Sequence, residues 1–398
     1  MSDEKLVPKL RFAGFDDEWI IKKLGDVSEI NPKTSELPES FIYIDLESVN
    51  NGILTKYNQI NKEDAPSRAQ RCLEVNDILF QTVRPYQMNN LFFELNDGNY
   101  VASTGYAQIK AKIVPKFLYY YLHYNKFVNE VLNRCTGTSY PAINSNDLKK
   151  IKIKIPTSFK EQMLIGDLFY KIDEKIELLK QNYDYYQNFK KYLMQQIFAQ
   201  KLRFDFDDEW KQYKLKELLT VKSSGISINQ LEDNTGDYPL YGASGFIKNI
   251  DFCEMDRDYI SIVKDGSGVG NLSYHEKNSS IVNTSQYLLP KDDYNIHFVY
   301  YLLQTLNLLK YVNGSSIPHI YFKDYCIEKV YVPNTLEQQK IGKLFVDIDN
   351  TLENINNSIQ VTQEFKKGLL QQMFVYIMEP ILLNFCAKIC CIKNFLKS

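Results

Sequence analysis

The sequence predicts an α+β protein in which two mixed α/β globules are separated by an antiparallel pair of long coiled-coil helices. Three observations lead to this prediction. The 398-residue chain contains two related copies of one arrangement, and each copy ends in a long segment with the 3.5-residue apolar period of a coiled coil. Each copy also contains short β-type runs broken by Gly, Asn and Asp.

The first repeated segment, which we call the Trp box, marks the start of each copy. Residues 10–24 and 202–215 share the pattern L-R-F-x-F-D-D-E-W, with one residue fewer in the second copy. The two tryptophans of the chain, Trp19 and Trp210, occupy the same position in it. The two boxes therefore indicate an internal duplication rather than chance similarity.

Two further pairs of segments follow the Trp box in the same order. The Gly-Ser-Pro motif, G-[ST]-S-x-P-x-I-x-x-x-D, occurs in residues 137–148 and 314–325. Residues 161–198 and 337–374 both begin with E-Q and I-G-x-L-F and end with F-K-K-x-L-x-Q-Q-x-F. The spacing between the copies is constant along this last pair, whereas the stretches before the motifs share little.

The last pair of segments is predicted to form two long helices. Ser158-x-x-Glu161 and Thr335-x-x-Gln338 have the signature of a capping box. Apolar residues then alternate in steps of three and four, with a lysine at one seam position of each helix. The expected seam contains Ile172, Ile176, Leu179 and Leu193 in the first helix, with Lys190, and Ile348, Leu352, Ile355 and Leu369 in the second, with Lys366.

Each seam spans only about four heptads, so one such helix alone would be marginally stable. We therefore expect the two helices to pack against each other, antiparallel, within the chain. A plain dimerisation coiled coil is the alternative interpretation.

The stretches at about 25–155 and 216–332 are predicted to be the mixed α/β globules. Each combines short strands with one aromatic helical segment before the Gly-Ser-Pro motif. The expected strands are 41–46, 77–83, 106–113, 258–263 and 285–290, and the expected helical segments are 115–132 and 297–312.

These patterns divide the chain into six parts. The predicted parts are an N-terminal segment with the first Trp box (1–24), the first globule (25–155), the central helix region (156–201), the second Trp box with the second globule (202–332), the distal helix region (333–374) and an apolar Cys-containing tail (375–398).

Composition excludes several classes of protein. Lys and Arg number 47 against 49 Asp and Glu, a net charge of −2, which argues against a histone-like, wholly electrostatic nucleic-acid binder. Seven cysteines without a C-x-x-C pair and four scattered histidines make disulfides and a zinc site unexpected. We see no signal peptide and no transmembrane run, and expect a cytoplasmic protein that does not bind membranes.

Two loops and the Gly-Ser-Pro motifs carry the side chains best suited to nucleic acid. Arg, Gln and Asn can contact base edges, while hydroxyls and backbone N–H groups of a glycine turn suit phosphates. The candidates on loops 81–90 and 264–271 are Arg84, Tyr86, Gln87, Lys264, Ser267 and Asn271, and those in the motifs are Thr138, Ser139, Ser315 and Ser316. A purely structural turn is an equal alternative for the motifs.

A third group of candidates is a row of lysines in the first half. Residues 149–156 read KKIKIKIP, which predicts a strand with isoleucines on one face and Lys150, Lys152 and Lys154 on the other. Such a row can neutralise backbone phosphates. A solvated edge strand protected by lysines explains the pattern equally well.

Together, the two Trp boxes, the two Gly-Ser-Pro motifs and the two helical repeats resemble the specificity subunit of type I restriction-modification systems. The resemblance covers about residues 10–374, and the start of the second globule, YPLYGASGFI (238–247), also looks like a start of that family's target-recognition domains. It implies two target-recognition domains, each reading one half of a bipartite DNA site, with spacer helices that set the gap.

The resemblance also implies partners and a division of labour. Besides double-stranded DNA, the partners would be two modification (adenine methyltransferase) subunits, docked on the spacer helices, and the restriction (endonuclease and translocase) subunits. S-adenosylmethionine, ATP and magnesium would belong to these partner subunits, and this chain would hold no cofactor, no metal and no catalytic residue. In agreement, the sequence contains no N-P-P-[FY] and no Walker A motif. The alternative hypothesis is a protein–protein scaffold with two globules on a coiled-coil rod.

The tail at 375–398 departs from the family pattern. It contains three of the seven cysteines and is interrupted by Glu379, Pro380 and Lys388. We interpret it as an extension without a role, as a shifted or truncated reading frame would give, with a partner-contact helix as the alternative.

Overall fold

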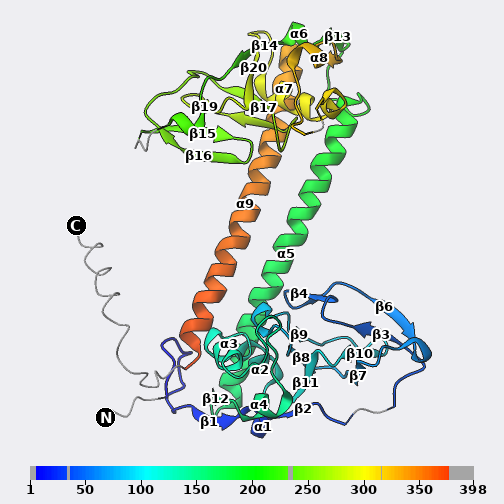
Figure 1. Cartoon of the computed structure of the whole chain (residues 1–398), viewed down its shortest axis with the longest axis vertical. Coiled ribbons are helices and arrows are strands. Elements are labelled where there is room, and N and C mark those ends of the chain that lie inside the picture. The colour runs from blue at the N-terminus through cyan, green and yellow to red at the C-terminus, as the bar shows by residue number, and fades with distance from the viewer. Residues whose placement is uncertain (1–5, 34–35, 232–235, 315, 376–398) are drawn as a thin grey trace. The chain divides into compact units, whose positions relative to one another are not determined.

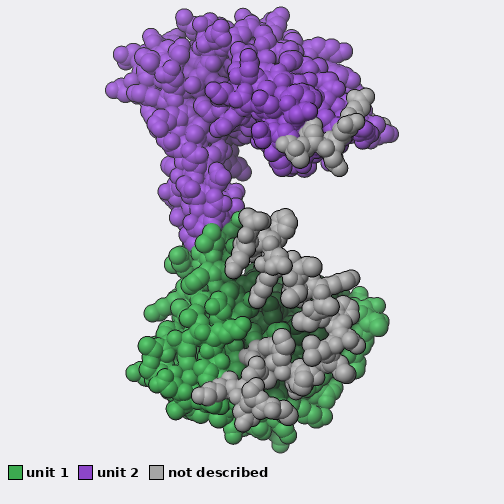
Figure 2. Space-filling model, turned by 90° about the vertical axis from the view of Figure 1, so that its left-hand side faces the viewer, with its two compact units in different colours: residues 1–178, 359–398 green, residues 179–358 purple. Residues whose placement is uncertain are grey.

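The computed structural model describes residues 6–33, 36–231, 236–314 and 316–375. The chain divides into two compact units (Figure 2). The first unit comprises residues 1–178 and 359–398, and the second comprises residues 179–358. Each unit therefore takes one globule and one part of each long helix.

The first unit contains two four-stranded sheets and two small ribbons (Figure 1). One sheet has the order β2 (Ser28–Ile30), β11 (Tyr106–Ala111), β8 (Ile78–Gln81), β9 (Leu91–Phe92). The other has the order β6 (Asn58–Asn61), β3 (Ser40–Ile44), β10 (Tyr100–Ser103), β7 (Ala69–Cys72). The ribbons are β1 (Ile20–Lys23) with β12 (Lys152–Ile155), and β4 (Val49–Asn50) with β5 (Ile53–Leu54).

Short helices complete this globule. They are α1 (Leu24–Val27), α2 (Pro115–Tyr121), α3 (Asn125–Leu132) and α4 (Ser145–Lys150), with 3-10 turns η1 (Lys62–Asp64) and η2 (Pro85–Gln87). The β2-β11-β8-β9 sheet and α2 share one apolar core with the start of the long helix α5 (Phe159–Phe198), including Phe80, Phe117 and Phe169. The globule is thereby fixed directly to the helix.

The second unit repeats this plan with fewer strands. Its sheets have the orders β14 (Leu219–Ser223), β20 (Ser285–Pro290), β17 (Tyr259–Val263), β18 (Leu272–His275), and β16 (Gly245–Ile250), β15 (Tyr238–Gly242), β19 (Ser280–Ile281). A ribbon pairs β13 (Lys211–Lys214) with β21 (Lys329–Val332). The helices are α6 (Leu215–Leu218), η3 (Ile228–Gln230), α7 (Ile296–Gln304), η4 (Leu308–Tyr311), α8 (Phe322–Tyr325) and the long α9 (Thr335–Met373).

The predicted fold class is confirmed, including the antiparallel helices. In the first unit, Phe169 of α5 stacks on Phe374 and Asp173 bonds to Lys366, so α9 numbering falls as α5 numbering rises. In the second unit, Lys190 bonds to Asp349 and Phe198 stacks on Phe345, which gives the same direction. Figure 1 shows α5 and α9 side by side within each unit.

The seam residues pack as the period requires. Six of the eight expected apolar positions are buried, whereas Leu179 and Leu352 are half-buried. The buried six are Ile172, Ile176, Leu193, Ile348, Ile355 and Leu369. The seam lysines are not fully exposed: Lys190 pairs with Asp349 and Lys366 with Asp173 across the helix pair, each at 2.6 Å.

The predicted capping boxes are wrong in part. Ser158 Oγ accepts from the backbone N–H of Glu161 at 3.4 Å, but the Glu161 side chain turns toward the Trp box and does not close the box. In the second copy the cap is Asn334, whose Oδ1 accepts from Glu337 N–H at 2.9 Å, so the Thr335 assignment is one residue late. A single side-chain acceptor suffices to cap each helix.

The two aromatic helical segments are each broken once. His123 Nδ1 lies 2.9 Å from the carbonyl oxygen of Tyr119 and separates α2 from α3. Thr305 Oγ1 donates to the carbonyl oxygen of Leu302 at 2.7 Å and ends α7 before η4. In both places a side chain satisfies a helix-end carbonyl, which the apolar pattern alone does not reveal.

The predicted row of three lysines is also wrong. Asn144 accepts from Asp147 N–H at 2.9 Å and starts a helix that runs through Lys150. Lys150 is thus helical and pairs with Asp147 at 3.1 Å. Only Lys152 and Lys154 remain on the strand, because N-capping by Asn144 outweighs the alternating pattern at its start.

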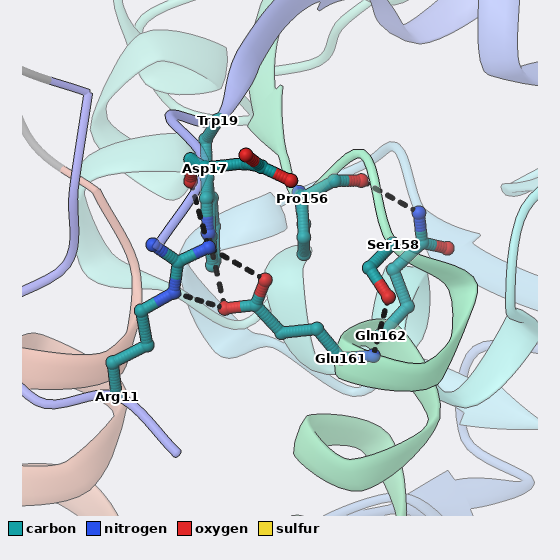
Figure 3. A network of polar contacts seen from close by, with 7 residues as sticks. All are labelled: Arg11, Asp17, Trp19, Pro156, Ser158, Glu161 and Gln162. Atoms are coloured by element: carbon teal, nitrogen blue, oxygen red, sulfur yellow. Dashed lines mark hydrogen bonds and ion pairs between the residues drawn. The ribbon is translucent and has the colours of Figure 1, made fainter. Parts of the chain in front are cut away.

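A polar clamp, shown in Figure 3, explains why the Trp box and the helix repeat together. Arg11 donates through Nε and Nη2 to the two carboxylate oxygens of Glu161 at 2.7 and 2.9 Å, and Nη2 also donates to the Asp17 carbonyl at 2.7 Å. Trp19 Nε1 donates to Glu161 at 3.3 Å. The carboxylate is only 1% exposed, so this bidentate pair neutralises a buried charge at the start of α5.

The second unit repeats the clamp. Arg203 bonds to both oxygens of Glu337 at 3.1 and 2.8 Å and to the Asp208 carbonyl at 2.7 Å. Within the described part of the chain, the Trp210 indole nitrogen has no hydrogen-bond partner, in contrast to Trp19. The box therefore anchors each globule to a long helix chiefly through its arginine.

No helix in the described part of the chain is long and apolar enough to cross a membrane, and no group of three or more His, Cys, Asp or Glu side chains there could hold a metal ion. Of the tail predicted at 375–398, only Val375 lies within the described residues, where it is buried; residues 376–398 lie outside them.

The buried His275 makes the stability of the second unit depend on pH. It is 9% exposed, its Nε2 lies 2.9 Å from Ser261 Oγ, and burial lowers its pKa from the usual 6.5 to about 4. Between pH 4 and pH 6.5 the unfolded chain binds more protons at this histidine than the folded chain does. The stability that depends on keeping His275 neutral is therefore complete above pH 6.5 and is lost as the pH falls toward 4. It amounts to about 3 kcal/mol.

We expect His275→Gln to flatten the fall in stability of the second unit between pH 7 and pH 4.5. The measurement is urea unfolding followed by fluorescence of Trp210 in a Trp19→Phe background, which reports on the second unit alone. Equal pH slopes for the variant and its parent would contradict the assignment.

Candidate nucleic-acid interface

In the first globule the Gly-Ser-Pro motif forms a tight turn. Gly137 has φ +88°, and Thr136 and Ala142 exchange backbone hydrogen bonds of 2.9 and 3.0 Å across the turn. A Cβ at Gly137 would lie 3.1 Å from the Tyr140 carbonyl oxygen, so the left-handed backbone and the close approach both favour glycine. The exposed tip contains Thr138, Ser139 and Tyr140.

This turn is attached to the loop that follows β8. The backbone N–H of Arg84 donates to the Pro141 carbonyl at 2.7 Å, and that of Ile143 donates to the Thr82 carbonyl at 3.1 Å. The motif (137–148) and loop 81–90 therefore form one surface, although they lie far apart in the sequence.

The second globule joins its motif and loop in the same way. Asn313 and His319 exchange backbone hydrogen bonds of 2.9 and 2.8 Å around Gly314, whose φ is +87°. Gly266 N–H donates to the Pro318 carbonyl at 2.8 Å, and Ile320 N–H donates to the Lys264 carbonyl at 2.8 Å. Loop 264–271 thus occupies the position that loop 81–90 has in the first unit.

Sequence reasoning selected these loops for their chemistry but missed that they are equivalent. The backbone bonds align Thr82 with Lys264 and Arg84 with Gly266, and these pairs share no side-chain chemistry. The hydrogen bonds that align these positions use backbone groups, so no pattern of residue types in the sequence predicts them. One shared scaffold therefore presents two chemically different loops.

In the first unit the candidate side chains on the loop differ in their exposure and in their contacts. Tyr86 is 49% exposed, whereas the exposed Gln87 accepts at Oε1 from Gln81 Nε2 at 2.8 Å. Arg84 is half-buried, with its guanidinium 4.4 Å from the ring centroid of Tyr140. Tyr140, 62% exposed, is a residue that the sequence analysis missed.

The second unit presents a more neutral surface, because its candidate lysine is ion-paired. Lys264 pairs with Asp265 at 3.0 Å, whereas Ser267, Asn271 and Ser316 are exposed. Ser315 lies outside the described residues. Glycines at 266, 268 and 270 all have positive φ, which suits a tight hairpin tip rather than a cofactor loop.

The lysine candidates lie on other elements. Lys150, at the end of α4, is ion-paired, while Lys152 is exposed and Lys154 half-buried on β12. The register places Lys152 opposite Lys23 of β1, which concentrates positive charge on this ribbon.

Each unit is thus a mixed α/β domain, attached by a repeated clamp to an antiparallel helix pair, and its loop surface differs in sequence from that of the other unit. This is the organisation of a duplicated recognition protein. The chain belongs to the family of type I restriction modification DNA specificity domains, which it matches twice, over residues 16–184 and 207–363. The resemblance that the sequence motifs indicated is confirmed, and the protein is a type I specificity subunit with two recognition domains.

Solved and curated relatives agree. The crystal structure of the type I S subunit of M. genitalium has a TM-score of 0.64 and 20% identity, covering 94% of this chain and 100% of that chain. The HindI specificity subunit of Haemophilus influenzae is 25% identical over 40% of this chain and 36% of its own length. The MjaVIII specificity subunit of Methanocaldococcus jannaschii is 26% identical over 42% of each chain. This chain therefore spans less than half of these two curated relatives.

Proposed function

We propose that each globule of this chain reads one half of a bipartite DNA site and that the helix pair sets the gap between the halves. The observation that carries the proposal is the pair of equivalent loop-and-motif surfaces, built on one backbone scaffold with different side chains. A duplicated scaffold with divergent loops is what two unlike half-sites require, because base edges are read by side chains while the scaffold only positions them.

Methylation by the assembled complex tests this proposal. The chain would be produced with its methyltransferase subunits in a methylation-free host, and modified adenines would be mapped by sequencing the host genome. We expect one motif with two defined parts and a fixed run of unspecified bases between them. A continuous motif, or methylation without any motif, would contradict the proposal and favour the protein–protein scaffold.

We further propose that the methyltransferase subunits dock on the long helices, one in each unit. Two exposed apolar pairs support this. Tyr185 and Phe189 of the second unit are 64% and 37% exposed, and Val361 and Phe365 of the first unit are 65% and 58% exposed. The helix repeat aligns Tyr185 with Val361 and Phe189 with Phe365. Exposed apolar groups at equivalent positions are expected for two copies of one partner.

Substitution of these phenylalanines tests the docking proposal. Phe189→Asp and Phe365→Asp should each remove one methyltransferase copy, because a charge at a buried hot spot costs on the order of 2 kcal/mol or more. The double variant should bind none. The stoichiometry would be measured by mass photometry of purified complexes.

Matched control variants place the same charge on exposed apolar residues outside the helices. Tyr57→Asp in the first unit and Ile327→Asp in the second start from residues that are 58% and 56% exposed. These controls should keep both partner copies. Two copies retained by the double helix variant would overturn the docking proposal.

The division of labour follows as part of the same proposal. This chain supplies recognition and no catalytic residue, while S-adenosylmethionine, ATP and magnesium are held by the methyltransferase and restriction subunits. The absence of N-P-P-[FY] and Walker A motifs from the sequence supports this. The cytoplasm, where host DNA is found, is the proposed location.

A further inference from the structure

The loop around Arg84 contains two residues in an unfavourable backbone conformation. Arg84 and Met88 both adopt left-handed backbone conformations, with φ of 54° and 52°, at the two ends of the turn η2. Residues other than glycine adopt this conformation at a cost in energy, so the surroundings must hold them there. Such strain is commonly stored where a side chain has to be aimed.

A buried amide holds the loop from beneath. Gln81 is 1% exposed, and its Nε2 donates to the Val83 carbonyl at 2.7 Å and to Gln87 at 2.8 Å. Its Oε1 accepts from Asn89 N–H at 3.2 Å, and its backbone N–H donates to Asn90 Oδ1 at 2.8 Å. These bonds fix the loop on both sides of the turn that contains Arg84.

The guanidinium of Arg84 is positioned but has no carboxylate partner among the described residues. It lies 4.4 Å from the ring centroid of the exposed Tyr140, and the Arg84 backbone N–H is held by Pro141. By contrast, Lys150 and Lys264 are ion-paired with Asp147 and Asp265. Stacking on an aromatic ring orients the flat guanidinium without consuming its hydrogen-bond donors.

From this arrangement we infer that Arg84 reads a guanine in the half-site of the first globule, an inference that rests on the proposed function. A guanidinium presents two parallel N–H donors that match guanine O6 and N7 in the major groove, a pairing that lysine reproduces poorly. Tyr140 orients the guanidinium for this contact. The aligned position in the second globule is Gly266, which has no side chain, so the contact belongs to one half-site only.

The test compares variants by methylation-motif mapping and by competition binding of the whole complex to motif and single-base-substituted duplexes. Arg84→Lys keeps the positive charge but loses the two parallel N–H donors of the guanidinium. We expect it to lose roughly 10- to 100-fold discrimination at one G·C pair of the first half-site, with the second half-site and the gap unchanged. Tyr140→Ala should weaken discrimination at the same base pair, and Tyr140→Phe, which keeps the ring, should restore it.

Two control variants separate this role from general DNA contact and from misfolding. Arg134 follows α3 by two residues, is exposed and pairs with Glu130 at 3.5 Å, so Arg134→Lys should leave the motif unchanged. Lys152→Ala should weaken binding equally for all sequences, as a phosphate contact does. An intact second half-site in each variant shows that the complex has assembled.

The outcomes distinguish the inference from the function on which it rests. A bipartite motif that Arg84→Lys leaves unaltered, or weakens uniformly at all bases, overturns the inference alone. A first half-site without any G·C pair also overturns it. A parent complex without a bipartite motif overturns the proposed function and the inference together.

Discussion

The structure depends most on one interaction, a Lys–Asp–Tyr triad that crosses the helix seam once in each unit. In the first unit, Lys366 Nζ lies 2.6 Å from Asp173, which also accepts from the Tyr120 hydroxyl at 2.9 Å. In the second unit, Lys190 lies 2.6 Å from Asp349, which accepts from the Tyr301 hydroxyl at 2.6 Å. Each triad joins both long helices to the first helix of the globule's aromatic segment.

The value of these triads lies in register more than in stability. The aspartates are 36% and 37% exposed, so solvent screens the ion pairs and each contributes little net free energy. An apolar seam of alternating Ile and Leu, however, can slide by a heptad with little penalty. A polar pair in the seam whose members must meet each other excludes such slips. The triads thus hold each globule at one position along its helices, which a fixed gap between half-sites requires.

Duplication separates what must stay constant from what must vary. The clamp of Arg11 with Glu161, and its copy of Arg203 with Glu337, are retained with nearly the same distances. The loop surfaces keep only backbone bonds to their motifs, so side chains such as Arg84 can change without altering the scaffold. A near-neutral net charge agrees with recognition that depends on local surfaces rather than on overall attraction.

The sequence predicted the architecture because periodic and repeated patterns record packing. The heptad spacing located the seam, and the Trp boxes located the starts of the two copies. The sequence did not predict which side chains far apart in the chain would contact each other. Glu161 has the signature of a capping box, but Arg11, 150 positions away, takes its carboxylate. The seam lysines stood out as polar exceptions, yet nothing local identified Asp173 or Asp349 as their partners.

The candidate surface was predictable only in part for the same reason. Loop composition pointed to Arg84 and Lys264, but the bonds that unite each loop with its motif use backbone atoms, and Tyr140 gave no separate signal. The lysine row failed where a local cap at Asn144 overrode the alternating pattern.

In the proposed function, each globule specifies its own half-site on a common backbone scaffold. The most direct measurement replaces residues 25–155 with the matching domain of a relative that methylates a different motif, and maps the methylated sites of the chimeric complex. We expect one half of the motif to change, while the other half and the gap stay as they were. Changes in both halves, or an unaltered motif, would contradict the proposed function.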